Sequence, residues 1–392
     1  MRATYSRTRE KYWFIRLDAR QTNEQRSCNS EVYVASLVGR QEKALSRAAI
    51  ETSTCGGSKG RLSGPRLVRA TRPFAVEDVT KSRVLLAQTL LCLVVLHLGI
   101  VWAPLWLKPV LATVTGALYI RLFIFYHDFL HGAQLTTSWV TRWMMHGVGY
   151  LMLTTTSVWR ETHDFHHRCN ARVIGSGIGS FPVVTLRMWR GMSPKDRRLY
   201  RILRHPITMV FGYITVFMIG MSIAPFRRNP KQHWQSFLAL VVHFGAIVGV
   251  GLWLGWWQAF FSVVMPLFVS MALGSYLFYV QHNFPDVTYF ERRAWKFDQA
   301  AVRSSSMFDM PAWAHWFTGN IGYHHIHHLN HRIPFYQLPE VYDAIEELQE
   351  PGRTSWKPSD IRECLSLAVW DPQRARMITY EELRETAPET FA

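Results

Sequence analysis

The chain has 392 residues; 48% of them are hydrophobic, 14% are aromatic and 16 are tryptophans, a composition typical of membrane proteins with an aromatic belt. The net charge of +16 does not indicate a nucleic-acid-binding protein, because the basic residues flank long apolar runs and the sequence contains no nucleic-acid-binding module. Anionic lipid and the positive-inside rule explain this charge better. The five cysteines form no CxxC pair, so they support neither a thiolate metal site nor a disulfide framework.

Residues 1–80 are rich in arginine and serine and include the run CGGSKGRLSGP, which predicts a basic, flexible N-terminal tail. The same composition allows a targeting segment, although scattered acidic residues weaken that interpretation. The next methionine after Met1 is Met144, so a mis-assigned start near Val68 or Val76 is a further hypothesis. N-terminal sequencing of the native protein would test it.

Two apolar runs, 84–107 and 109–132, are each long enough for a spanning helix of ~20 residues and predict a helical hairpin. If the second helix starts at Pro109, a rise of ~1.5 Å per residue places His127 and His131 at or just past the far interface.

A second hairpin is predicted from the runs 236–257 and 259–280, and it ends at His282.

The segment 207–226 is apolar enough to span the membrane, but both of its flanks are basic, and one crossing cannot have both ends inside. We therefore expect 207–226 to lie along the interface or to dip in and return. The prediction is an all-α, multi-pass fold with four transmembrane helices, interfacial helices and a histidine-rich cap on the cytoplasmic face, followed by a cytosolic C-terminal tail at 346–392.

Three histidine clusters stand out: HDFLH at 127–131, HDFHH at 163–167 and HHIHH at 324–328. On a helix, residues at i, i+3 and i+4 share one face, so each cluster would present its histidines together. Eight imidazoles exceed what one tetrahedral metal ion uses, which favours two metals, and His282 would add a ninth ligand. The predicted ligands are His127, His131, His163, His166, His167, His282, His324, His327 and His328. Imidazole suits Fe, Zn, Cu and Ni, so the metal stays open.

Other polar residues near the clusters have two interpretations. Asp128 and Asp164 follow the leading histidine of their clusters and either orient an imidazole or face water. For His315 and His331, packing is favoured over support of the ligands, whereas His325 is expected to support its neighbours rather than to bind metal.

The order and spacing of the clusters resemble those of the integral-membrane fatty acid desaturases, over roughly residues 72–350. The stretches GNIGYHHIHHLNHRIPFYQLPE and QHNFPD are most similar to the acyl-lipid type, which includes delta-12 and omega-3 desaturases. The resemblance implies a desaturase domain over 81–345 and a non-haem di-iron centre held by the nine histidines. Some relatives with acyl-CoA substrates have an asparagine where this chain has Phe278, so a water or Asn320 is a candidate to fill that place.

The resemblance also implies an O2-dependent oxidoreductase that makes a cis double bond in an acyl chain carried on lipid, CoA or a carrier protein. An unactivated methylene has no acidic proton and no leaving group, so removing its hydrogen requires the strong oxidant that iron and O2 supply. No HPGG-like element is present, so a separate electron donor such as ferredoxin or cytochrome b5 is expected. The basic loop 187–204 would dock such a donor or bind lipid headgroups.

Two other functions stay open from the sequence. A related di-iron hydroxylase or ketolase, acting on lipids, alkanes or carotenoids, would use the same histidine spacing and differ in its products. A histidine-lined metal transporter would need polar residues inside the membrane, whereas the predicted spans are nearly uncharged.

Overall fold

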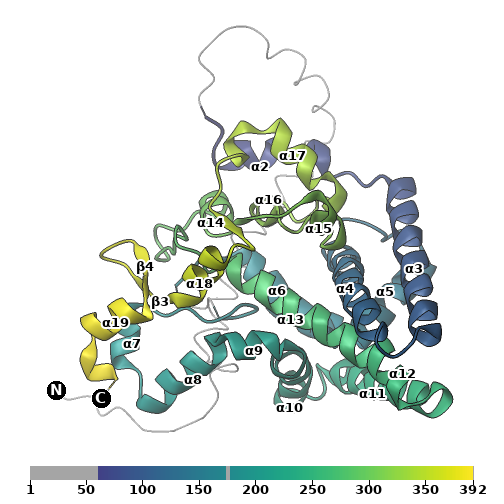
Figure 1. The fold of residues 1–392 in the computed structure, drawn as a ribbon. Coiled ribbons are helices and arrows are strands. Elements are labelled where there is room, and N and C mark those ends of the chain that lie inside the picture. The colour runs from purple at the N-terminus through teal and green to yellow at the C-terminus, as the bar shows by residue number, and fades with distance from the viewer. Residues whose placement is uncertain (1–60, 174–176, 392) are drawn as a thin grey trace, which may run out of the picture.

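The computed structural model describes residues 61–173 and 177–391, and this part of the chain is mostly helical (Figure 1). Most of the predicted N-terminal tail lies outside the described residues. Its last part does contact the body of the protein. The backbone N–H of Leu62 donates to the Glu347 carboxylate (2.6 Å), and that of Gly64 donates to Asp298 (2.9 Å).

Four helical segments are long and apolar enough to cross a membrane, which agrees with the predicted number and approximate positions. They are α3 (Val79–Trp102), α4 (Lys108–His131), α11 (Trp234–Leu254) and the continuous run of α12 (Trp256–Ala259), η3 (Phe260–Val264) and α13 (Met265–Val280). Helix α4 is the most enclosed and packs against α3 and α13. Helices α3 and α11 are the least enclosed of the four, and most of their apolar side chains are at least partly exposed, as lipid contact requires.

Helix α4 approaches α13 closely at Gly116. A Cβ atom there would lie 2.7 Å from the Val269 Cβ and 2.8 Å from the Pro266 carbonyl oxygen. We expect Gly116→Ala to destabilise the protein by ~1–3 kcal/mol, because the two helices must separate. Gly245→Ala on α11 is the control, since a Cβ there meets no described atom within 4 Å. Thermal unfolding in detergent measures both variants, and equal midpoints would contradict the prediction.

The segment predicted to avoid a full crossing is divided into α9 (Pro206–Val210), a π-helical stretch η2 (Tyr213–Ile223) and α10 (Ala224–Arg228). It packs on α13 and α11, and it is not among the four candidate spans. Its position relative to the membrane stays a prediction.

The remaining helices lie outside the candidate spans, and α6 and α16 among them carry histidine clusters. Before α11 they are α2 (Pro65–Ala70), η1 (Arg72–Phe74), α5 (Trp139–Leu151), α6 (Thr156–Cys169), α7 (Leu186–Gly191) and α8 (Pro194–Arg204). After α13 they are α14 (Phe297–Arg303), α15 (Ala312–Phe317), α16 (His324–Leu329), η4 (Phe335–Gln337), α17 (Leu338–Ala344), η5 (Glu346–Leu348), α18 (Pro358–Ser366), α19 (Tyr380–Thr386) and η6 (Pro388–Thr390).

Four short strands make the described chain mostly helical rather than entirely so, which corrects the predicted all-α class. Strand β1 (Met307–Asp309) pairs in parallel with β2 (Arg353–Ser355), and β3 (Leu367–Asp371) pairs antiparallel with β4 (Arg376–Thr379). Neither sheet was expected, because each pair is too short to show a period-2 pattern in the sequence.

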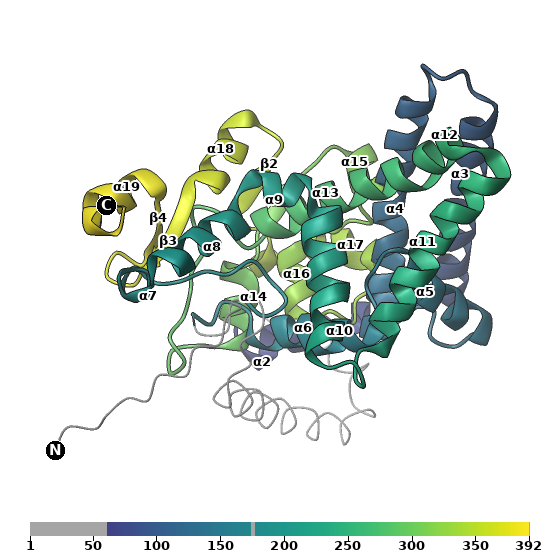
Figure 2. The same cartoon turned by 90° about the horizontal axis from the view of Figure 1, so that it is seen from below.

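The C-terminal unit, residues 358–391, is folded, whereas we expected a tail. Val369 and Ile378 of the strand pair are buried with Trp189 of α7 and Tyr200 of α8 in a small separate core. This core joins segments far apart in the sequence, so no local pattern reveals it. Both views place α19, β3 and β4 at one end of the molecule, opposite α3 and α12 (Figure 1, Figure 2).

Candidate metal centre

Each histidine cluster lies on a helix, as its spacing predicts. His127 and His131 are on the last turns of α4, His163, His166 and His167 on α6, and His324, His327 and His328 on α16. Helix α4 ends after His131 because Gly132 adopts φ 71°, a left-handed conformation that glycine tolerates. His282 comes from the turn directly after α13.

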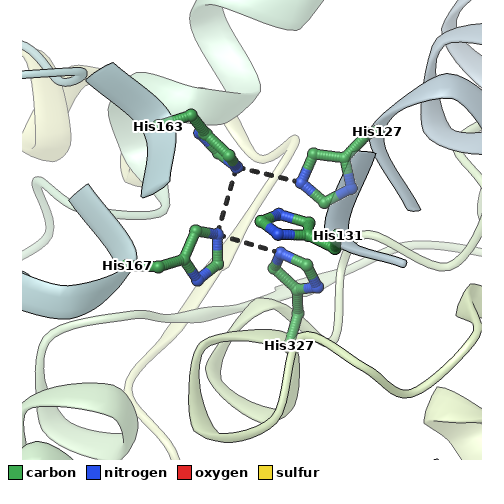
Figure 3. A group of neighbouring side chains, drawn as sticks. All are labelled: His127, His131, His163, His167 and His327. Atoms are coloured by element: carbon green, nitrogen blue, oxygen red, sulfur yellow. Dashed lines mark hydrogen bonds between the residues drawn. The ribbon is translucent and has the colours of Figure 1, made fainter. Parts of the chain in front are cut away.

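The structure brings the nine predicted histidines into two buried groups. The first group contains His127, His131, His163, His167 and His327, and its potential ligand nitrogens all lie within 4.8 Å of one another (Figure 3). The Nε2–Nε2 distances are 3.1 Å from His163 to both His127 and His167, and 3.1 Å from His167 to His327. Within the described chain, the buried Nε2 atom of His131 has no hydrogen-bond partner.

The second group contains His166, His282, His324 and His328, and its ligand nitrogens meet the same 4.8 Å limit. Nε2 of His282 lies 3.0 Å from that of His166 and 2.9 Å from that of His324, which is 3.2 Å from that of His328. A neutral imidazole has one proton and one bare lone pair, so several converging Nε2 atoms cannot all satisfy one another. A cation at the centre of each group would satisfy them.

Burial lowers the pKa of the seven site histidines that lie outside the candidate spans, and the charge of neighbouring imidazoles lowers the pKa of most of them further. The pKa of His282 falls to about 4 through burial, against which its hydrogen bond to Ser304 acts. The pKa values of His163, His166, His167, His324, His327 and His328 lie well below the usual one. These side chains are therefore neutral at pH 7, which is the form that binds metal.

Asp128 contacts His127 of the first group and is buried, which favours orientation of an imidazole over exposure to water. Its Oδ1 lies 3.1 Å from Nδ1 of His127, while its Oδ2 accepts from Nε2 of Gln134 (3.0 Å) and from the backbone N–H of Phe335 (2.8 Å). Holding Nδ1 in this way directs Nε2 of His127 toward the other imidazoles. Asp164 is half-buried, and no hydrogen bond joins it to a histidine in the described chain.

The contacts of the other three histidines near the clusters indicate different roles for them. Nε2 of His325 bonds to the Leu348 carbonyl (2.9 Å), so His325 points away from both groups. The His331 ring lies 4.7 Å from that of His131 and 5.3 Å from that of His167, which places it beside the first group. His315 packs on Tyr323 at 5.1 Å, the structural role favoured for it.

Two aromatic side chains pack against the histidine rings and present apolar surface to them. Trp159 lies 4.1 Å from the His163 ring, and Phe278 lies 5.3 Å from that of His166 and 5.4 Å from that of His282. Sequence reasoning missed Trp159, although it stands four residues before His163 and thus on the same helix face. The Asn320 amide donates to the Phe335 carbonyl (3.2 Å), a contact that does not involve either histidine group. This contact therefore gives no support to the hypothesis that Asn320 takes the place of the asparagine found in some relatives.

A small cavity lies beside the second group and is lined by His166, His282, Cys169 and Tyr289, with Ile178 and Ser180 among the residues of the facing loop. The loop approaches α6 closely at Gly179, where φ is 68°. A Cβ atom there would lie 2.3 Å from the Thr162 carbonyl oxygen and 3.2 Å from the His166 Cβ. Only glycine fits this position without displacing the loop.

We expect Gly179→Ala to weaken metal binding by the second group about 10-fold, because displacing the loop costs ~1–3 kcal/mol and disturbs His166. Gly177→Ala in the same loop is the milder control, because its tightest contact would be the Pro182 Cβ at 3.3 Å rather than a backbone atom at 2.3 Å. Metal titration of the purified variants measures both. An affinity of Gly179→Ala equal to that of the control would show that the loop does not position His166.

The candidate spans and the site together define an integral membrane protein with two adjacent histidine groups, each able to hold a metal ion. Residues 80–359, well over half of the chain, match the model of the fatty acid desaturase family. The chain therefore belongs to this family and is a membrane fatty acyl desaturase, which confirms the family and the oxidoreductase activity predicted from the histidine clusters.

Several relatives agree with this assignment. A fatty acid desaturase of Bacillus subtilis is 29% identical over 277 residues, covering 70% of this chain and 78% of its own. An sn-1 oleoyl-lipid 12-desaturase of Synechocystis is 24% identical over 263 residues, covering 66% and 74%. An sn-1 acyl-lipid omega-3 desaturase (ferredoxin) of Nostoc is 22% identical over 290 residues, covering 69% and 76%.

Proposed function

We propose that the protein introduces a cis double bond into the acyl chain of a membrane lipid, using O2 and two iron ions. His127, His131, His163, His167 and His327 would hold one ion, and His166, His282, His324 and His328 the other. The observation that carries this proposal is the convergence of nine buried imidazoles, one of them with an unpartnered Nε2 atom, into two adjacent groups. The family favours iron over the other metals that imidazole binds.

The overall reaction balances without any other oxidant. The acyl chain loses two hydrogens from neighbouring carbons, O2 takes up these hydrogens with two electrons and two protons, and two water molecules form. Bound iron would supply, together with O2, the oxidising power to remove hydrogen from an unactivated methylene.

The chain's own residues hold and shield this site. Asp128 fixes the orientation of His127, and the Ser304 carbonyl lies 3.1 Å from Nδ1 of His282. Trp159 and Phe278 present apolar surface to the histidines, which excludes water and suits an acyl chain arriving from the bilayer. The substrate would be an acyl lipid, as in the names of the Synechocystis and Nostoc relatives, with acyl-CoA and acyl carriers as other carrier forms.

The membrane arrangement we propose is two helical hairpins, α3 with α4 and α11 with α12–α13, with both histidine groups on the cytoplasmic face. The basic flanks of the segment 207–226 support this orientation through the positive-inside bias. Cysteine-accessibility mapping that placed residues 227–235 outside would overturn it.

Electrons would come from a separate donor such as ferredoxin or cytochrome b5, and the name of the Nostoc relative mentions ferredoxin. Helices α7 and α8 expose several basic side chains that could bind an acidic carrier: Arg187, Arg190, Lys195, Arg198 and Arg201. Raising the ionic strength should then slow reduction by the carrier.

The test is the fatty acid profile of a host that expresses the chain with a competent electron donor, compared with a His163→Ala variant. Gas chromatography with mass spectrometry should find a new double bond made only by the parent protein. Hydroxylated or keto lipids in place of unsaturated ones would assign the hydroxylase or ketolase chemistry instead. Metal uptake by vesicles with no O2-dependent change in lipids would favour a transporter.

A further inference from the structure

The C-terminal unit lies mostly beyond the family match, which ends at residue 359, yet it contacts the residue next to His282 of the second histidine group. The link is Asn283, the residue directly after His282 and 2% exposed. Its Nδ2 donates to the Cys364 carbonyl of α18 (2.7 Å). Its Oδ1 accepts from Nη2 of Arg204, the last residue of α8 (2.6 Å).

Arg204 extends this link. The side chain is 2% exposed, and its guanidinium also donates to the carbonyls of Leu367 (3.0 Å) and Pro182 (3.0 Å). It lies over the rings of Tyr200 and Tyr279, at 5.4 and 5.2 Å. These three charge-assisted bonds are buried, so breaking any one of them is costly, and they hold the acceptor groups in place. The Nε atom of Arg204 has no hydrogen-bond partner among the described residues.

His282 depends on such support more than the other eight histidines do. Those eight lie on helices, whose geometry holds them in pairs or triplets, whereas His282 lies in the turn after α13. The backbone of this turn is held on one side by Tyr289, whose hydroxyl donates to the His282 carbonyl (3.0 Å). On the other side, the Asn283 side chain holds the turn through its hydrogen bonds to Arg204 and to Cys364 of the C-terminal unit.

We propose that Asn283 and Arg204 are positioning residues through which the C-terminal unit holds His282 in the second metal group. This inference rests on the proposed function, in which each histidine group binds one metal ion. The second group then depends on the C-terminal unit, and the first group does not.

The experiment titrates purified, metal-free full-length protein with Co(II), whose visible absorption reports occupancy of histidine sites, and counts bound ions per chain. The parent should bind two. Asn283→Leu should bind the first ion as the parent does and the second ~10–100-fold more weakly, the range for loss of a residue that orients a ligand. Asn283→Asp keeps the acceptor for Arg204 but loses the donor to Cys364, so its second site should be intermediate.

Tyr200→Phe is the matched control. It removes the hydrogen bond from Tyr200 to the Ala368 carbonyl (2.6 Å), at the same interface between α8 and the C-terminal unit, without touching Asn283. It should bind both ions with the affinity of the parent. Thermal unfolding of each metal-free variant separates lost folding from lost positioning.

Two ions bound by Asn283→Leu with parental affinity would overturn the proposal. So would equal weakening of both sites, since that is a general structural effect. A parent that binds fewer than two ions would instead refute the proposed two-metal function, and this inference with it.

Discussion

Replacing His327 with alanine should abolish double-bond formation, whereas replacing His325, two residues earlier in the same run, should leave it largely intact. Both side chains are buried in α16, but they differ in direction. Nε2 of His327 lies 3.1 Å from that of His167 in the first group, while Nε2 of His325 bonds to the Leu348 carbonyl. Removing a ligand should reduce the rate by at least about 100-fold, the upper range for groups that only orient ligands.

The measurement is the amount of new unsaturated fatty acid per unit of expressed protein, with iron per chain determined on the same samples. His327→Ala should lose iron from the first group. His325→Ala should keep iron but unfold more easily, by ~1–3 kcal/mol, because the Leu348 carbonyl loses its partner. Active His327→Ala protein, or equal losses in the two variants, would show that the run acts through packing alone.

Asp128→Asn should weaken metal binding in the first group by ~10–100-fold and slow desaturation accordingly. The carboxylate faces three groups with two oxygens: His127 on Oδ1, and Gln134 and the Phe335 N–H on Oδ2. Asparagine has a single acceptor oxygen, so its amide NH2 must face either His127 or the two donors, which are the Gln134 amide and the Phe335 N–H. The orientation of His127 or the contact with Phe335 is lost.

Asp164→Asn is the matched control, because Asp164 also follows the leading histidine of its cluster but is half-buried. It should bind metal and desaturate lipid as the parent does. Metal titration of both purified variants, together with product analysis, makes the comparison. Equal effects of the two substitutions would mean that Asp128 contributes charge to the region rather than orientation to His127.

The sequence predicted the parts of the site that depend on local geometry. The i, i+3, i+4 spacing of His163, His166 and His167 places them together on any helix, and the structure has them on α6. Span length likewise predicted that His127 and His131 end a helix. Spacing could not distinguish Asp128 from Asp164, because the difference comes from Gln134 and Phe335, which reach only one of them through tertiary contacts.

The C-terminal unit was missed for the same physical reason. All five residues of β3 are buried, but this run is too short to separate a strand from a helix or a loop by its pattern. Its burial depends on Trp189 and Tyr200, which lie far away in the sequence. A small core shared between distant segments leaves no periodic signal in either segment.

The burial of so many neutral imidazoles also bears on how the protein is made in a cell. Converging lone pairs without a cation are unfavourable, so metal binding contributes to the folding free energy of this region. When the free metal concentration is 100 times the dissociation constant of one site, binding adds about 2.7 kcal/mol to the free energy of unfolding. This is a large share of the stability of an ordinary domain. Under the proposed function, in which the metal is iron, less of the newly made chain would fold where iron is scarce, and quality-control proteases would remove more of it, so that the amount of enzyme follows iron supply.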